Sequence, residues 1–196
     1  MNVLIAGGTG LISTAFTRQL LARGGALTLF NRGRTPALFA GEVRRLVGDR
    51  RGYSAFEASM HGAIGGGFDC VIDMICMAPA DAESTVRAFR GRTWHYIFCS
   101  TVDVYAMPAS RYPTDEEEPQ RPTGRYGAEK SACEAVFMDA RRRGDFSVTI
   151  IRPAQSYGES GTPQHTFGRR GGVLHRLRHG KPVIVHLNPP GAEHPR

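Results

Sequence analysis

The first thirteen residues constrain the fold of this chain more than any other stretch. An apolar run, Val3–Ala6, leads directly into the turn Gly7–Gly10, and helical spacing begins at Leu11. Glycines let the backbone turn tightly and approach a ligand closely, and the unpaired N–H groups of a helix N-terminus attract an anion. The pattern therefore predicts a phosphate-binding turn at the start of an α/β domain. The alternative is an ordinary strand-to-helix turn in a chain that contains 24 glycines.

The rest of the chain continues the alternation of strands and helices. Leu11–Ala22 has helical spacing and stops at Arg23-Gly24-Gly25, and Leu27–Phe30 predicts a second strand. Such a succession predicts an α/β fold with a Rossmann-like, doubly wound parallel sheet flanked by helices. We expect one domain over residues 1–186 and an irregular tail over 187–196. Further strands are predicted at 43–47, 68–74, 94–99, 146–151 and 180–185, and further helices at 53–64, 81–89, 126–143 and 173–179.

Composition narrows the class of protein. A chain of 196 residues with 41% hydrophobic content is long enough to bury a core, and it has no apolar run of bilayer length. Because Met1 is followed directly by a core strand, we expect a soluble, cytoplasmic protein. The four cysteines are scattered without metal-ligand spacing, which predicts free thiols and no metal site.

The net charge of +7 raises the question of a nucleic-acid partner. Of the 25 basic residues, all except Lys130 and Lys181 are arginines, and they are spread along the whole chain. Such a general excess is more typical of a solvated surface than of a polyanion site. Nucleic acid is therefore the less favoured partner, and a small molecule the favoured one.

The end of the second predicted strand indicates which dinucleotide would bind. An acidic residue at this position would hold the 2′-hydroxyl of an adenosine ribose, but the chain has Asn31, Arg32 and Arg34 there. Two guanidinium groups favour a 2′-phosphate, so NADP is favoured over NAD. The alternative is a solvated Arg-Gly turn. Asp49, after the third strand, either accepts a hydrogen bond from adenine or caps the turn that follows.

Residues suited to acid/base chemistry follow the fifth predicted strand. Ser100 and Thr101 lie at its carboxyl end, where an open parallel sheet binds ligands. A long polar loop at 107–124 is expected to form a flap beside the substrate. Tyr126 and Lys130 then share one helix face, four residues apart. In a chain with two lysines, a lysine at this position indicates a site that requires an ammonium group.

These motifs together resemble the short-chain dehydrogenase/reductase superfamily, in its extended or atypical branch of NAD-dependent epimerases and dehydratases. The resemblance extends from Met1 to about Val185. It rests on the turn from Gly7 to Ser13, Asp49, Cys99-Ser100-Thr101 with Val104-Tyr105, Tyr126-x-x-x-Lys130, and Arg152-Pro153 with Tyr157-Gly158.

The resemblance implies residue roles and an activity. Thr101, Tyr126 and Lys130 match the catalytic hydroxyl, the acid/base and the ribose-binding lysine of an NAD(P)-dependent oxidoreductase or epimerase-dehydratase acting on a hydroxyl or carbonyl carbon. The turn at Asn31 also resembles atypical members, including chloroplast stem-loop RNA-binding proteins, so a non-catalytic dinucleotide-binding or RNA-binding module is the alternative. The implied cofactor-binding residues are Gly7, Thr9, Gly10, Leu11, Ile12, Asn31, Arg32, Arg34, Asp49, Met74, Lys130 and Pro153.

The length of the chain departs from the resembled pattern. Family members usually continue for another hundred or more residues, which supply a last strand and most of a substrate domain. The resemblance therefore implies either a truncated or frame-shifted member or one recruited to a task that needs only the dinucleotide fold. In either case the strand at 146–151 is expected to be an open sheet edge. We expect a homodimer, or a partner chain that completes the substrate side.

Overall fold

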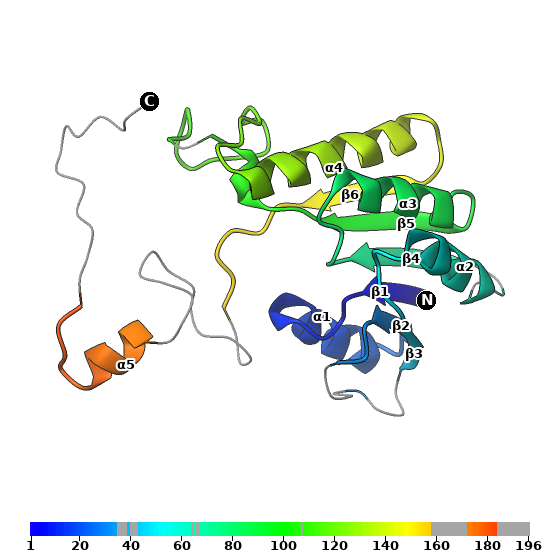
Figure 1. The fold of residues 1–196 in the computed structure, drawn as a ribbon, viewed down its shortest axis with the longest axis horizontal. Helices are drawn as coiled ribbons and strands as arrows, with labels where there is room; N and C mark the ends of the chain where they lie inside the picture. Colours follow the sequence, from blue (N-terminus) through cyan, green and yellow to red (C-terminus); the bar gives the residue numbers. More distant parts are fainter. Residues whose placement is uncertain are drawn as a thin grey trace. The chain divides into compact units, whose positions relative to one another are not determined.

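The computed structural model describes residues 1–34, 39, 43–63, 65, 67–106, 108–157 and 172–183 (Figure 1). The chain divides into two units, Met1–Ala154 and Gln155–Arg196. The predicted domain end at residue 186 and the predicted tail at 187–196 lie outside the described residues. The second unit contains one helix, α5 (Gly172–Arg178), within the part that is described.

The first unit is a parallel sheet flanked by helices, as predicted. Its strand order is β3-β2-β1-β4-β5-β6. Strands β2 and β3 are added on one side of β1, and β4, β5 and β6 are then added on its other side, so the strand order reverses between β1 and β4. Ligands bind at such a reversal in doubly wound sheets, outside the carboxyl ends of the strands. The elements are β1 (Asn2–Ala6), α1 (Leu11–Ala22), β2 (Ala26–Asn31), β3 (Arg44–Val47), α2 (Tyr53–Ala63), β4 (Phe68–Asp73), α3 (Pro79–Phe89), β5 (Thr93–Cys99), the short 3₁₀ helix η1 (Val102–Val104), α4 (Arg125–Arg142) and β6 (Ser147–Ile151).

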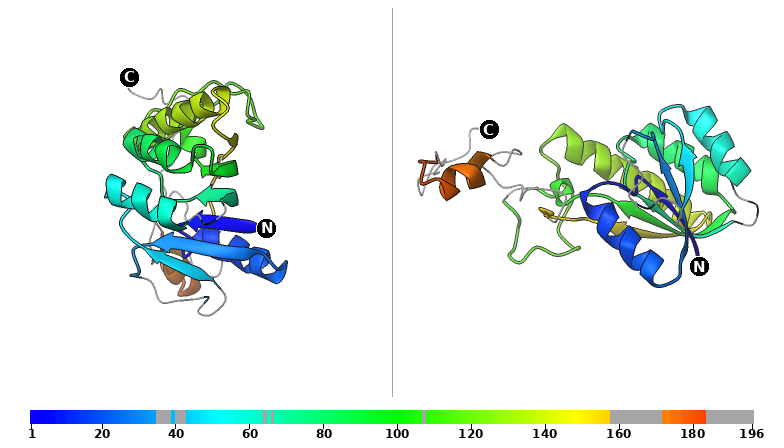
Figure 2. Two further views of the ribbon diagram at one scale, coloured as in Figure 1. Left: turned by 90° about the vertical axis from the view of Figure 1, so that its right-hand side faces the viewer. Right: turned by 90° about the horizontal axis from the view of Figure 1, so that it is seen from below.

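The two faces of the sheet have separate cores. In β1, Leu4 and Ala6 belong to a buried cluster that includes side chains of α2, α3 and α4. Val3 and Ile5 point to the opposite face and belong to a cluster against which α1 packs. Figure 2 shows α1 on one side of the sheet and α2, α3 and α4 on the opposite side. The alternation of side chains along a strand explains why β1 is apolar throughout.

Most predicted boundaries differ from the structure by no more than one residue, and two predicted elements differ by more. Helix α3 begins at Pro79 rather than at Asp81, because proline fits the first turn of a helix and the Asp81 carboxylate accepts hydrogen bonds from the N–H groups of Met77 (2.9 Å) and Ala78 (3.2 Å). Residues 180–183 of the strand predicted at 180–185 are in no strand, and residues 184 and 185 lie outside the described residues.

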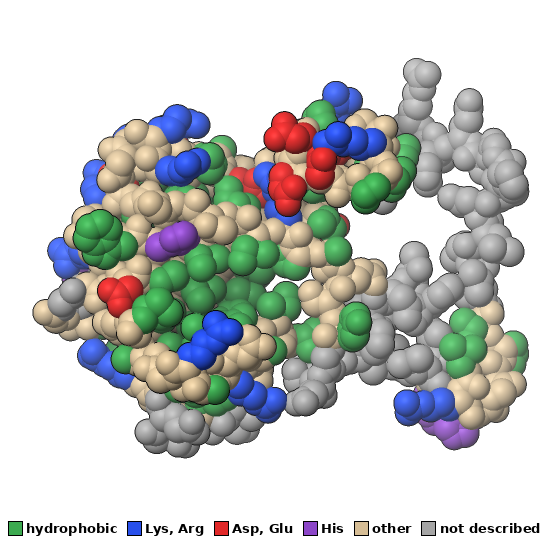
Figure 3. All heavy atoms as spheres, turned by 180° about the vertical axis from the view of Figure 1, so that it is seen from behind, with side chains coloured by type: hydrophobic (Ala, Val, Ile, Leu, Met, Phe, Trp, Pro, Cys, Tyr) green, Lys and Arg blue, Asp and Glu red, His purple; other side chains and the backbone are tan. Residues whose placement is uncertain are grey.

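The α1 face of the sheet is less covered toward β5 and β6. Ile97 of β5 is half-buried, and Ile151 of the edge strand β6 is 49% exposed. Figure 3 views this face and shows hydrophobic side chains lining a hollow. The six strands thus leave part of one apolar face open among the described residues.

A bilayer-spanning helix is not found: no helix in the described part of the chain combines the required length and apolarity.

Candidate functional site

The glycine turn joins β1 to α1 at the point where the strand order reverses. Gly7 (φ +114°) and Gly8 (φ +69°) have backbone conformations that disfavour other residues. A Cβ at Gly8 would also lie 2.7 Å from Leu29 Cδ2. Gly10 precedes α1 with φ −90°, and among the described residues a Cβ there would have only Ser13 Oγ within 4 Å, at 3.5 Å. Since the surrounding protein leaves room at Gly10, the space beside the turn fits a phosphate group.

Ser13 has a role that the sequence analysis missed. Its hydroxyl accepts a hydrogen bond of 2.9 Å from the Gly10 N–H, and its side chain is buried. The predicted cradle therefore already has one of its N–H groups paired. The N–H groups of the first turn of α1, including those of Leu11 and Ile12, have no carbonyl of their own helix to pair with, by the geometry of a helix N-terminus. The sequence feature that could have predicted this hydrogen bond is a serine three residues after the helix N-cap.

An apolar cavity of about 300 Å³ is lined by residues of α1 and of the strands β4, β5 and β6. Its lining includes Ile12 at the start of α1, Met74 after β4 and Pro153 after β6. These three residues were predicted separately to bind the cofactor, and the structure brings them to one cavity. Cys99, at the end of β5, lines the same cavity. The arrangement can receive the apolar face of a planar ring at the carboxyl edge of the sheet.

The other end of the predicted dinucleotide site lies beyond β2 and β3. Arg32 and Arg34 are exposed, and the Asn31 side chain accepts a 2.9 Å hydrogen bond from the Gly33 N–H. This hydrogen bond stabilises the turn and accounts for an asparagine at position 31. Asp49 likewise accepts a 2.9 Å hydrogen bond from the Arg51 N–H, which is the turn-capping alternative. Its contact with adenine remains a prediction.

Lys130 is buried in α4 with 1% of its surface exposed. Its ammonium donates hydrogen bonds to the carbonyl oxygens of Cys76 (2.8 Å) and Cys99 (2.6 Å), and it lies 4.5 Å from the centre of the Phe98 ring. Two backbone segments that follow β4 and β5 therefore hold this cation at the carboxyl edge. An ammonium has three N–H donors, so one remains for a ligand in addition to these two bonds.

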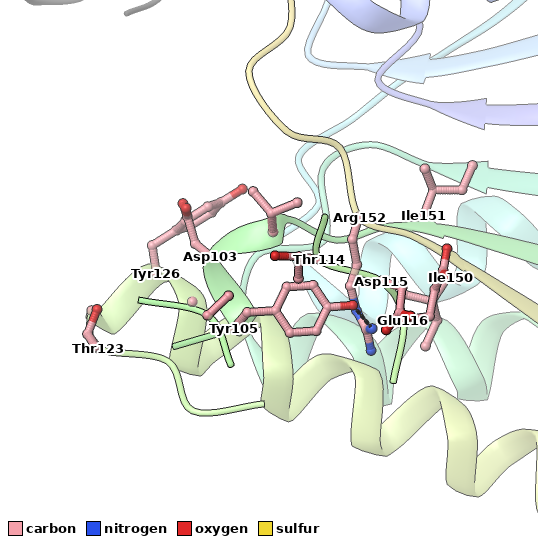
Figure 4. A pocket seen from close by; sticks show the side chains of 14 residues that line it. Asp103, Tyr105, Thr114, Asp115, Glu116, Thr123, Tyr126, Ile150, Ile151 and Arg152 are labelled. Carbon is pink, nitrogen blue, oxygen red and sulfur yellow. Dashed lines mark hydrogen bonds between the residues drawn. The ribbon is translucent and has the colours of Figure 1, made fainter. Parts of the chain in front are cut away.

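Tyr126 and Thr101 have different surroundings from Lys130. Tyr126, in the first turn of α4, is 46% exposed and lines an open cavity of about 770 Å³ (Figure 4). Thr101 is buried, and its hydroxyl accepts a 3.2 Å hydrogen bond from the Asp103 N–H at the start of η1. Asp103 lines the 770 Å³ cavity beside Tyr126. The structure thus places the Tyr126 phenol side chain at an accessible surface and the Thr101 hydroxyl in a buried position at the start of η1.

The predicted flap also contributes to this cavity. Thr114, Asp115 and Glu116 of the loop line it, together with Tyr105 and Arg152 from the sheet side. The cavity therefore combines hydroxyl groups and carboxylates around the Tyr126 side chain.

Arg152 forms a fixed wall of the cavity. Its guanidinium makes two parallel hydrogen bonds to the buried carboxylate of Glu134, at 3.0 and 2.6 Å, and a third to the Tyr105 hydroxyl. Figure 4 shows the Tyr105 ring extending toward Arg152. The pKa of Arg152 is raised, first by the hydrogen bond to Glu134. Because its charge is already paired with Glu134, the Arg152 guanidinium contributes a fixed surface to the cavity and does not offer an unpaired positive charge to a ligand.

The thiols near the site are poor nucleophiles. Burial raises the pKa of Cys76 well above its usual value, and contacts with Cys133 and Asp73 act in the same direction. Burial also raises the pKa of Cys99, although the Lys130 cation partly opposes the shift. Both side chains are therefore thiols at neutral pH, and thiolate chemistry does not fit this site.

Gly127 allows α4 to approach η1, a role that the sequence analysis did not assign. A Cβ at this position would overlap the carbonyl oxygen of Asp103 and would lie 3.1 Å from the Pro122 Cβ. Since Gly127 separates Tyr126 from the rest of the helix, this close approach sets the distance between the Tyr126 turn and the Thr101 segment.

We expect Gly127→Ala to lower the free energy of unfolding by about 1–3 kcal/mol, because backbone atoms must move to admit the methyl group. Urea unfolding measures the effect. Gly62→Ala is the matched control: Gly62 is also helical, but its Cβ would meet none of the described residues within 4 Å, so this variant should be unchanged or more stable by up to about 1 kcal/mol. Equal destabilisation of the two variants would contradict the proposed close approach.

Comparisons with known proteins were made on sequence and on structure. A model of the NAD dependent epimerase/dehydratase family matches residues 3–188. Two curated proteins are each 29% identical: chloroplast stem-loop binding protein of 41 kDa b from Arabidopsis thaliana, over 94% of this chain and 48% of the relative, and 2'-dehydrokanamycin reductase from Streptomyces kanamyceticus, over 94% of this chain and 51% of the relative. The chain thus spans about half the length of the curated relatives it matches.

Solved structures share the fold. UDP-glucuronic acid 4-epimerase from Bacillus cereus, in complex with NAD, matches with a TM-score of 0.74 and 16% identity, over 94% of this chain and 66% of that chain. At this identity the likeness establishes the architecture and no more.

Proposed function

The chain belongs to the NAD-dependent epimerase/dehydratase family, and on this basis we propose that it binds NAD or NADP and takes part in chemistry at a hydroxyl or carbonyl carbon of a sugar-like substrate. A curated relative named for reduction of 2'-dehydrokanamycin supports this substrate class.

One observation carries the proposal. Ile12, Met74 and Pro153 come from three distant parts of the sequence and line one apolar cavity, and Cys99 of the same cavity holds the Lys130 ammonium through its carbonyl oxygen. An apolar slot beside a fixed cation suits a nicotinamide ring and its ribose. The glycine turn at Gly7–Gly10, at the same edge, suits the pyrophosphate.

Each catalytic candidate has a distinct role in the proposal. When bound, the nicotinamide supplies hydride chemistry. Tyr126 moves a proton at the substrate oxygen, and Thr101 donates a hydrogen bond to the same oxygen, since its hydroxyl accepts from Asp103 N–H and keeps its own proton to donate. Lys130 holds the ribose through its remaining N–H donor. The cavity of about 770 Å³ beside Tyr126 is the proposed substrate site.

Calorimetric titration of the purified chain with NADH and NADPH tests the proposal. We expect Lys130→Met to weaken binding at least tenfold, because the ammonium is lost from the proposed ribose site. Lys181→Met is the matched control, since Lys181 is the other lysine of the chain and its side chain is exposed. Failure of the wild-type chain to bind either dinucleotide would refute the proposal.

We also propose that NADP binds more tightly than NAD. Arg32 and Arg34 are exposed at the end of β2, where their guanidinium groups can reach a 2′-phosphate. Arg32→Ala should weaken NADPH binding by about 10- to 100-fold, as expected for loss of a charge-assisted hydrogen bond, and should leave NADH binding unchanged. The same titration measures both. Equal affinities of the wild-type chain for the two cofactors would contradict the preference.

RNA binding is a second candidate function, favoured by the similarity to a chloroplast stem-loop binding protein and by the net charge of +7. It requires an affinity that falls steeply with salt and that Tyr126→Phe leaves unchanged. Fluorescence anisotropy with a labelled RNA stem-loop at several salt concentrations separates this function from the enzymatic one.

The proposed assembly is a homodimer, or a complex with a chain that completes the substrate side. The position of β6 at the edge of the sheet and the open apolar face near Ile151 support it.

A further inference from the structure

Asp73 ends β4 and is almost completely buried, with 1% of its surface exposed. Its two carboxylate oxygens have separate partners. Oδ2 accepts hydrogen bonds from the Arg50 guanidinium (2.8 Å) and the Tyr96 hydroxyl (2.7 Å). Oδ1 accepts from the backbone N–H groups of Ile75 and Cys76, both at 2.9 Å. One oxygen is therefore anchored by side chains, and the other shapes the turn that leaves the strand.

That turn ends at one of the two carbonyl groups that hold Lys130. The Cys76 N–H is fixed by Asp73, and the Cys76 carbonyl accepts the 2.8 Å hydrogen bond from the Lys130 ammonium. Among the described contacts of this ammonium are two backbone carbonyls and the face of the Phe98 ring, and no carboxylate. The position of the cation therefore depends on where the backbone places the carbonyl groups.

Arg50, which binds the Asp73 carboxylate, is itself held by several other residues. Arg50 also donates to the Asp81 carbonyl (2.7 Å) and to the Thr85 hydroxyl of α3, and its guanidinium lies 4.6 Å from the centre of the Phe56 ring of α2. Burial is the largest single influence on the pKa of Arg50 and would lower it, but the nearby groups Asp73, Tyr96, Cys76 and Asp81 together outweigh burial, and the pKa is raised. Two helices on one face of the sheet thus fix the guanidinium that orients Asp73.

We propose that Asp73, held by Arg50, is a positioning residue for Lys130: its Oδ1 sets the turn at Ile75 and Cys76 so that the Cys76 carbonyl holds the ammonium toward the dinucleotide. The inference rests on the proposed function, in which Lys130 binds the cofactor ribose. In the proposed arrangement, neither Asp73 nor Arg50 touches the cofactor. Their effect passes through the backbone of residues 73–76 and then through Lys130.

Two double variants isolate the role of Oδ1. Arg50→Met with Asp73→Asn removes the buried ion pair but keeps an amide oxygen that can accept from Ile75 and Cys76. Arg50→Met with Asp73→Leu removes the ion pair and this acceptor together. Neither variant leaves an unpaired buried charge, and both remove the Oδ2 acceptor of the Tyr96 hydroxyl, so a difference between them reports the loss of the turn acceptor.

The side-chain NMR signals of lysine provide a readout that does not depend on activity. Lysine labelled with ¹³C and ¹⁵N gives two sets of side-chain signals in this chain, from Lys130 and Lys181, and Lys130→Met identifies them. We expect the asparagine double variant to keep the Lys130 signal near its wild-type position and the dinucleotide Kd within about threefold. We expect the leucine double variant to move the signal toward that of the exposed Lys181 and to raise the Kd about tenfold.

An unchanged Lys130 signal in the leucine double variant would overturn the inference. If circular dichroism shows that this variant does not fold, Asp73→Glu serves in its place: it keeps the charge beside Arg50 but moves the carboxylate oxygen away from the turn, so it should displace the Lys130 signal, and an unchanged signal there would equally overturn the inference. Failure of the wild-type chain to bind a dinucleotide would refute the proposed function alone, because the lysine signals still test the connection from Asp73 to Lys130.

Discussion

Tyr126→Phe is expected to lower turnover at least 10²-fold while the dinucleotide Kd stays within about threefold of the wild-type value. The substitution keeps the ring and removes the hydroxyl that is proposed to move the proton. Because Tyr126 is 46% exposed and lines the 770 Å³ cavity, a substrate can reach this hydroxyl. Steady-state kinetics on a substrate found by screening sugar derivatives, with a parallel binding titration, gives both quantities.

Lys130→Met should behave differently from Tyr126→Phe, because Lys130 is proposed to bind the cofactor ribose as well as to serve the reaction. We expect it to weaken dinucleotide binding and to reduce turnover together. Tyr112→Phe is the control for loss of a tyrosine hydroxyl: Tyr112 is 70% exposed and is not among the residues that line the cavity. A Tyr126→Phe variant with wild-type turnover would exclude the catalytic role.

Local patterns predicted the parts of the site that lie close together in the sequence. The run from Val3 to Gly10 predicted the turn between β1 and α1, since a continuous apolar run and the glycines that follow it are local signals. The spacing of Tyr126 and Lys130 correctly predicted one helix carrying both. The order of strands and helices was likewise sufficient to predict the parallel sheet.

Long-range pairings could not be predicted in the same way. Asp73 was included only as part of an apolar strand, yet it pairs with Arg50, 23 residues earlier, and Arg50 was not singled out at all. Lys130 is buried, with 1% of its surface exposed. Its burial likewise depends on hydrogen bonds to the carbonyls of Cys76 and Cys99, which are 54 and 31 residues away in the sequence. Such contacts are set by tertiary packing, which a local pattern of residue types does not contain.

Arg50→Met should lower the free energy of unfolding by about 3–5 kcal/mol, the largest stability effect expected in this chain, because it leaves the Asp73 carboxylate buried without its cation. Both side chains are buried, with 6% and 1% of their surfaces exposed, so water does not replace the lost partner. Urea unfolding followed by circular dichroism measures the loss. Arg142→Met is the matched control, since the Arg142–Asp139 pair is exposed (69% and 49%) and should contribute less than about 1 kcal/mol.

The double variant Arg50→Met with Asp73→Asn should recover much of the loss caused by Arg50→Met alone. Most of the cost of the single substitution comes from the carboxylate that remains, and the neutral amide carries no such penalty. The pair itself is imperfectly satisfied, because Arg50 Nε is buried without a hydrogen-bond partner in the described part of the chain, which limits what the intact pair contributes to stability. A double variant no more stable than Arg50→Met would show that the guanidinium acts through its contacts with Asp81, Thr85 and Phe56 rather than by neutralising Asp73.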